Sequence, residues 1–62
     1  MYVRTWIMNF SYGDNAVNIQ FQTIDFYPRV GEFRGAQRLA ATYLGADSPL
    51  VVYINKITEV KN

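Results

Sequence analysis

The stretch that decides the fold is Arg4–Phe10, RTWIMNF, which alternates as a β-strand does but is apolar on both sides. Side chains of a strand point alternately to the two faces of its sheet. One face of this strand carries Trp6, Met8 and Phe10, and the other face carries Val3, Thr5 and Ile7. Three large side chains make the first face the stronger one, so we expect it to form the core. A strand that is apolar on its second face as well is typical of the middle of a sheet with a cover on both sides.

Two strands joined by a turn are predicted around this stretch. The first covers residues 2–12, and Gly13-Asp14-Asn15 is a cluster of turn formers. From Ala16 the apolar and polar residues alternate regularly, as in a half-buried antiparallel strand. The alternation changes phase at Thr23-Ile24-Asp25, which predicts a bulge or the end of the strand there.

A helix is predicted over residues 32–44, after Pro28 and Gly31 have interrupted the strand pattern. At 100° per residue its apolar face consists of Phe33, Ala36, Leu39, Ala40, Tyr43 and Leu44. Its opposite side carries Arg34, Arg38, Ala41 and Thr42. Gly45 stands where a helix C-cap glycine belongs, and Asp47-Ser48-Pro49 follows as a stop and turn.

A third strand is predicted over residues 50–60, which are rich in β-branched side chains. The order β-β-α-β makes the helix a crossover, and a right-handed crossover returns the last strand parallel to the second. We therefore expect an α+β fold with a three-stranded antiparallel sheet in the order 2-1-3 and the helix packed on one face. Residues 1–62 form a single small domain.

The composition excludes several classes of site. The chain has 62 residues with no Cys and no His, so neither disulfides nor the usual zinc, iron and copper sites are available. The usual catalytic arrangements for nucleophilic attack and proton transfer are missing for the same reason. The five carboxylates are interpreted as helix caps and solvated surface groups. No glycine-rich phosphate-binding motif occurs. We expect a protein that is not an enzyme and has no cofactor.

One helix covers one face of a three-stranded sheet and leaves the other open. An open apolar face is usually an interface, so we expect a homodimer formed through this face. The alternative is that aromatic side chains curl around the edges of a small core. Residues 50–54 extend the predicted surface, and its members are Val3, Thr5, Ile7, Val51 and Tyr53.

Three arginines, Arg29, Arg34 and Arg38, form the one local charge feature in a chain of net charge +1. Most such pairs on a helix are simply a solvated face. If Arg34 and Arg38 bind a partner, guanidinium groups suit an acidic protein surface or a phosphate.

Two functions from different classes follow. The preferred hypothesis is a small protein-interaction module, of the kind that acts as a regulator or inhibitor in phages and mobile elements. The alternative is a single-stranded nucleic-acid binder that uses sheet aromatics and the three arginines. The near-neutral charge favours the protein partner. No segment predicts a membrane span or a targeting signal, and we expect a cytoplasmic location.

Overall fold

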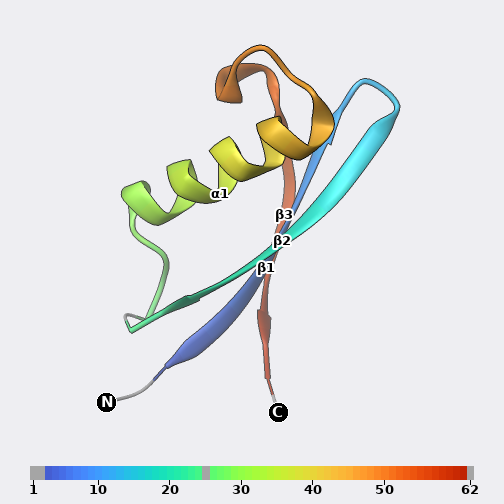
Figure 1. The fold of residues 1–62 in the computed structure, drawn as a ribbon. Helices are drawn as coiled ribbons and strands as arrows, with labels where there is room; N and C mark the ends of the chain where they lie inside the picture. Colours follow the sequence, from blue (N-terminus) through green and yellow to red (C-terminus); the bar gives the residue numbers. More distant parts are fainter. Residues whose placement is uncertain (1–2, 25, 62) are drawn as a thin grey trace.

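Three antiparallel strands form one sheet, and a helix lies across one of its faces (Figure 1). The computed structural model describes residues 3–24 and 26–61. Its elements are β1 (Arg4–Tyr12), β2 (Asn15–Thr23), α1 (Val30–Leu44), the 3₁₀ turn η1 (Pro49–Val51) and β3 (Tyr53–Val60). The strand order is β2-β1-β3, and β1 pairs antiparallel with both neighbours. The predicted α+β fold with its 2-1-3 sheet is confirmed, and RTWIMNF is the central strand.

The β1–β2 hairpin closes through a two-residue turn. Tyr12 pairs with Asn15, which leaves Gly13 and Asp14 as the central residues. Gly13 has φ +60° and no non-glycine residue that is described has a positive φ. Glycine with positive φ at the first central position is the requirement of a type II′ turn, whose twist matches that of the strands. The local sequence therefore fixes the hairpin register.

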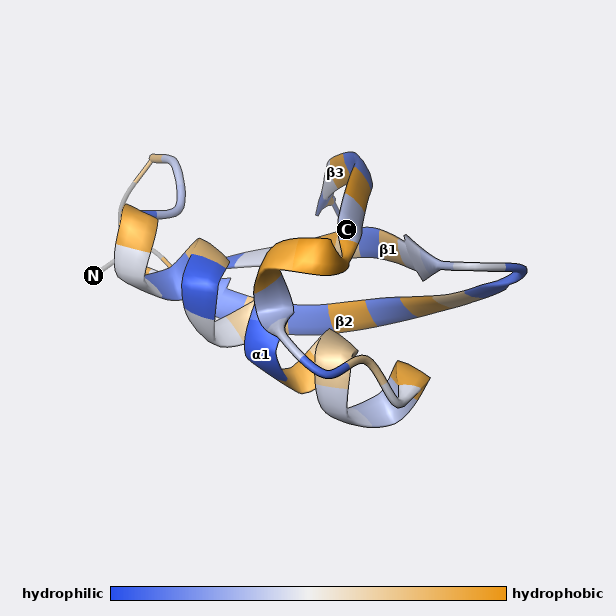
Figure 2. Cartoon of the chain, turned by 90° about the horizontal axis from the view of Figure 1, so that it is seen from above, coloured by the Kyte–Doolittle hydropathy of each residue, from blue (hydrophilic) through white to orange (hydrophobic). Residues whose placement is uncertain are grey.

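The change of phase at Thr23 marks the end of β2, and a bulge that the sequence does not predict lies in β3. β2 ends at Thr23, as its change of phase predicts, whereas Asp25 lies outside the described residues, as does Tyr2 at the predicted start of the first strand. The bulge is in β3: Asn9 pairs with Lys56 and Phe10 with Ile54, which leaves Asn55 as the extra residue. Alternation along β2 is visible as alternating hydrophilic and hydrophobic bands in Figure 2.

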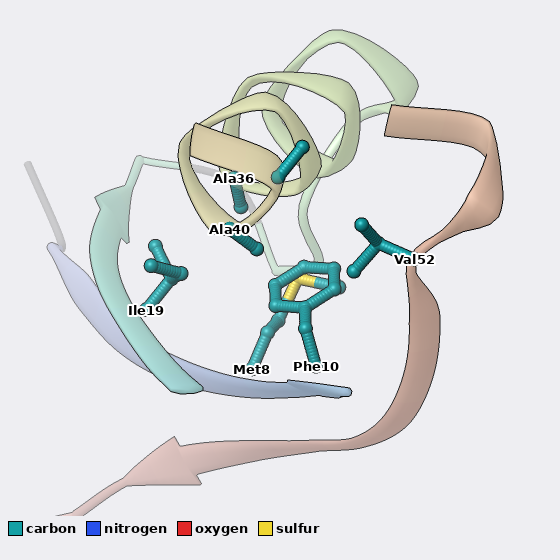
Figure 3. Close-up of a cluster of buried hydrophobic side chains, with 7 residues drawn as sticks. Met8, Phe10, Ile19, Ala36, Ala40 and Val52 are labelled. Atoms are coloured by element: carbon teal, nitrogen blue, oxygen red, sulfur yellow. The ribbon is translucent and has the colours of Figure 1, made fainter. Parts of the chain in front are cut away.

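The core lies between α1 and the face of the sheet that carries Met8 and Phe10, both of which are completely buried (Figure 3). Ala36 and Ala40 lie on the side of the helix that faces these side chains, and their small size lets the helix approach the sheet closely. The members of the buried cluster are Met8, Phe10, Ile19, Ala36, Ala40, Ala41 and Val52. The predicted face of β1 therefore forms the core.

Trp6 extends the same buried face beneath the segment that precedes α1. Its side chain is 5% exposed, and its Nε1 donates a 2.9 Å hydrogen bond to Thr23 Oγ1. The ring of Tyr27 packs edge-on against it, with centroids 5.3 Å apart. The indole is thus buried and its only polar atom is satisfied, which is the condition for placing Trp in a core.

The buried stripe of α1 is rotated from the predicted one. Ala41, predicted on the outer side, is buried, whereas Leu39 and Tyr43, predicted on the apolar face, are 52% and 73% exposed. Ala41 belongs to the buried cluster that includes Val52, the residue after η1, and η1 itself contacts α1 beside the sheet. Helical periodicity finds one apolar stripe but not the contribution of a cover from the side.

The first part of the predicted third strand is also corrected. Residues 50–52 are not in a strand, since Pro49–Val51 form a 3₁₀ turn and β3 begins at Tyr53. The Ser48 side chain accepts a hydrogen bond from the Leu50 backbone N–H at 3.2 Å, and Pro49 follows at the first helical position. An N-cap serine and a following proline stabilise a helical turn over an extended strand.

Candidate interaction surfaces

The face of the sheet opposite α1 is mostly polar and carries a chain of side-chain amides across all three strands. Asn55 donates from Nδ2 to Asn9 Oδ1 at 2.9 Å, and Asn9 donates from Nδ2 to Asn18 Oδ1 at 2.9 Å. Gln22 Nε2 lies 3.4 Å from Thr5 Oγ1 on the same face. The amides therefore tie β3, β1 and β2 together on the side that the helix does not cover.

Ile7 is the central apolar side chain of this face and is half-buried by its neighbours. Its cross-strand partners are Gln20 and Thr58, both polar. A shallow hollow of about 250 Å³ lies here, lined by Ile7, Asn9, Asn18, Lys56 and Thr58. The second face of RTWIMNF is thus less apolar than its sequence suggests, because β2 and β3 surround Ile7 with amides, hydroxyls and an ammonium group.

The structure divides the predicted partner-binding residues between two sides of the sheet. Thr5, Ile7 and Tyr53 share the polar face, with exposed Val3 just before β1. Arg34 and Arg38 lie on α1, on the opposite side of the sheet. The remaining member, Val51, belongs to η1 rather than to β3, so its predicted place on a strand face is wrong.

The two arginines line a groove between α1 and η1. The groove has a volume of about 390 Å³ and is formed by Arg34, Gln37, Arg38, Ser48, Pro49 and Leu50. Gln37 Nε2 is 3.5 Å from the Val52 carbonyl oxygen, and Ser48 Oγ already accepts from the Leu50 N–H. Two of its uncharged polar groups therefore have partners within the protein.

Arg34 and Arg38 are exposed, and neither forms an ion pair with a residue in the described part of the chain. The ion pair found there joins Arg4 Nη1 to Glu59 Oε2 at 2.8 Å. Arg29, the third arginine of the predicted cluster, precedes α1 and is not part of the groove lining. The groove thus presents two cationic groups toward solvent.

Exposed apolar side chains continue from the groove into β3. We call this set the β3 rim; its members are Leu50, Val51, Tyr53 and Ile54. Leu50 is 88% exposed and Tyr53 is 74% exposed. The rim is open because α1 lies over β1 and β2, while β3 passes to one side of the helix (Figure 3). Leu50 and Ile54 are not among the surface residues predicted from strand alternation, although the Ser48-Pro49 turn signal separates Leu50 from the strand.

A second group of exposed apolar residues precedes α1, at the other end of the helix (Figure 1). Its aromatic members have partners within the chain. Phe26 lies under the Arg4 guanidinium at 5.0 Å, and Tyr27 contacts both Trp6 and Phe33. This segment therefore has a structural role as the cover of Trp6, a role that no described contact gives to Leu50 or Tyr53.

The aromatic residues of the sheet do not form a platform for stacking bases. Trp6 and Phe10 are buried on the helix side, and Phe21, opposite Trp6 in the hairpin, shares that side. Tyr53 is the aromatic residue that the described strands place on the polar face. Nucleic-acid-binding sheets stack bases on several exposed rings beside basic residues.

Within residues 3–24 and 26–61, no group of acidic side chains is placed to hold a metal ion, and no helix is long and apolar enough to cross a membrane. No family model, curated protein or solved structure matches this chain.

Proposed function

We propose that this chain is a small, non-enzymatic protein-interaction module that binds a protein partner through the β3 rim. The observation that carries the proposal is the β3 rim itself, four exposed apolar side chains around the buried Val52, next to a groove with two arginines. Contiguous apolar surface beside polar groups is characteristic of protein interfaces. By occupying a surface of its partner, such a module acts as a regulator or inhibitor.

The energetics of the rim fit a binding role. Complete burial of one large apolar side chain contributes about 1.5–3 kcal/mol. Leu50 and Tyr53 are mostly exposed in the isolated chain, so most of this gain is still available for association. Tyrosine is also enriched among the residues that dominate interface energetics, because it combines a large apolar ring with a hydroxyl group.

The experiment is affinity capture from extracts of the source cells with three forms of the tagged protein. The double variant Leu50→Ser/Tyr53→Ser removes the centre of the rim. Leu39→Ser/Tyr43→Ser is its matched control, since it removes the same two residue types from the exposed flank of α1. We expect one partner to be retained by the wild type and the control and lost from the rim variant. Equal retention, or equal loss from both double variants, contradicts the proposal.

A further inference from the structure

We infer that the groove between α1 and η1 selects an acidic, amphipathic segment of the partner: two carboxylates bind Arg34 and Arg38, and an aliphatic side chain between them packs on Pro49 and Leu50. This inference rests on the proposed function, which does not specify the class of protein partner, and it names that class. The groove is then a second surface that recognises the partner, and it lies next to the β3 rim and shares Leu50 with it.

The charge of the groove is complementary to that of an anionic partner. Arg34 and Arg38 are four residues apart on α1, so their guanidinium groups project from the same side of the helix and repel each other. No described acidic side chain lies within ion-pair distance of either. An incoming pair of carboxylates removes this repulsion and satisfies the guanidinium donors bidentately. An anionic partner is therefore favoured over a neutral one.

The apolar wall of the groove distinguishes a peptide from other anions. Pro49 and Leu50 stand opposite the arginines, and Leu50 is almost fully exposed. An aliphatic side chain seated there buries apolar surface on both molecules. A nucleic acid offers phosphates but gains little from a leucine and a proline, and the groove is lined by no aromatic ring on which a base could stack.

The groove is also pre-formed. The Ser48 side chain caps η1, and the Val52 backbone N–H donates to the Pro49 carbonyl oxygen at 3.2 Å, so the apolar wall is held by its own hydrogen bonds. Gln37 reaches across from α1 to the Val52 carbonyl oxygen. Binding to a surface that is already ordered costs less conformational entropy than binding to a mobile one.

The test uses fluorescence anisotropy with defined probes. The first probe is a labelled peptide of repeated Glu-Leu-Glu units, the second has Gln in place of Glu, the third has Ser in place of Leu, and the fourth is a labelled oligothymidine. The protein is the wild type, Arg34→Gln/Arg38→Gln, or Lys56→Gln/Lys61→Gln. The lysine variant is the matched control, because it removes the same charge from β3 and the residue after it.

We expect the Glu-Leu-Glu peptide to bind the wild type and the lysine control alike, and the arginine variant about tenfold more weakly, the effect of two exposed ion pairs. Replacing either Glu or Leu in the peptide should weaken binding, and raising the salt concentration should weaken only the acidic probes. Circular dichroism is used to check that all three proteins are folded.

Three results overturn the inference. Binding of the oligothymidine at least as tight as that of the peptide, with the same dependence on the arginines, assigns the groove to nucleic acid. If the arginine and lysine variants weaken peptide binding equally, the binding depends on net charge and not on the groove. If no peptide binds, an acidic segment is not the ligand of the groove. Capture of a partner that depends on Leu50 and Tyr53 would still uphold the proposed function.

Discussion

Trp6 is the residue whose removal should cost the domain most. It is buried against Tyr27 and hydrogen-bonded to Thr23, so truncation leaves a cavity and removes the indole hydrogen bond. We expect Trp6→Ala to lower the free energy of unfolding by about 3–5 kcal/mol, enough to unfold a domain of this size. Circular dichroism and sedimentation on the same sample measure this. A folded Trp6→Ala variant would contradict the core assignment; Trp6→Phe, which keeps most of the ring contact, should remain folded.

Two glycines of the helical region should respond oppositely to alanine. Gly45 has φ +72° at the C-cap of α1, where a Cβ is strained, so Gly45→Ala should destabilise by about 1–2 kcal/mol. Gly35 lies within the helix, and no atom stands within 4 Å of a Cβ built there. Gly35→Ala should therefore stabilise by about 0.5–1 kcal/mol. Urea denaturation of both variants measures the difference, and a shift of the same sign in both would refute this account.

At the scale of the element, the rotated face of α1 can be tested by one matched pair of variants. Lysine at Ala41 places a charge in the buried cluster, whereas lysine at Tyr43 stays in solvent. We expect Ala41→Lys to destabilise by more than about 2 kcal/mol and Tyr43→Lys to change stability by less than about 0.5 kcal/mol. The denaturation midpoints of the two proteins decide between this face and the one that helical periodicity predicts, for which the order of the two effects is reversed.

At the scale of the whole molecule, self-association through the polar sheet face stays a prediction. Ile7 lies at the centre of that face, so the predicted homodimer should sediment with a concentration dependence in the micromolar range that Ile7→Lys abolishes. Leu50→Lys, on the β3 rim, is the control and should leave the dimer intact. A wild-type protein that sediments with the 7.2 kDa mass of one chain at every concentration is a monomer, and the homodimer is then excluded in favour of a different protein as partner.

The sequence by itself determined the parts of this protein that depend on local patterns. Alternation in RTWIMNF identified the core face, glycine and aspartate at 13 and 14 located the hairpin, and Gly45 ended the helix. The sheet order followed from the handedness of the crossover, which is a property of all L-peptides. These features require no knowledge of distant contacts.

Only the tertiary structure decided which surfaces are open, because exposure depends on residues far apart in the chain. Helical periodicity cannot show that Ala41 is buried in the core cluster with Val52 while Leu39 is exposed. Strand alternation likewise cannot show that polar side chains of β2 and β3 surround Ile7. The groove of Arg34 and Leu50 exists because η1 returns alongside α1, and its position is set by packing between elements, which no local pattern encodes.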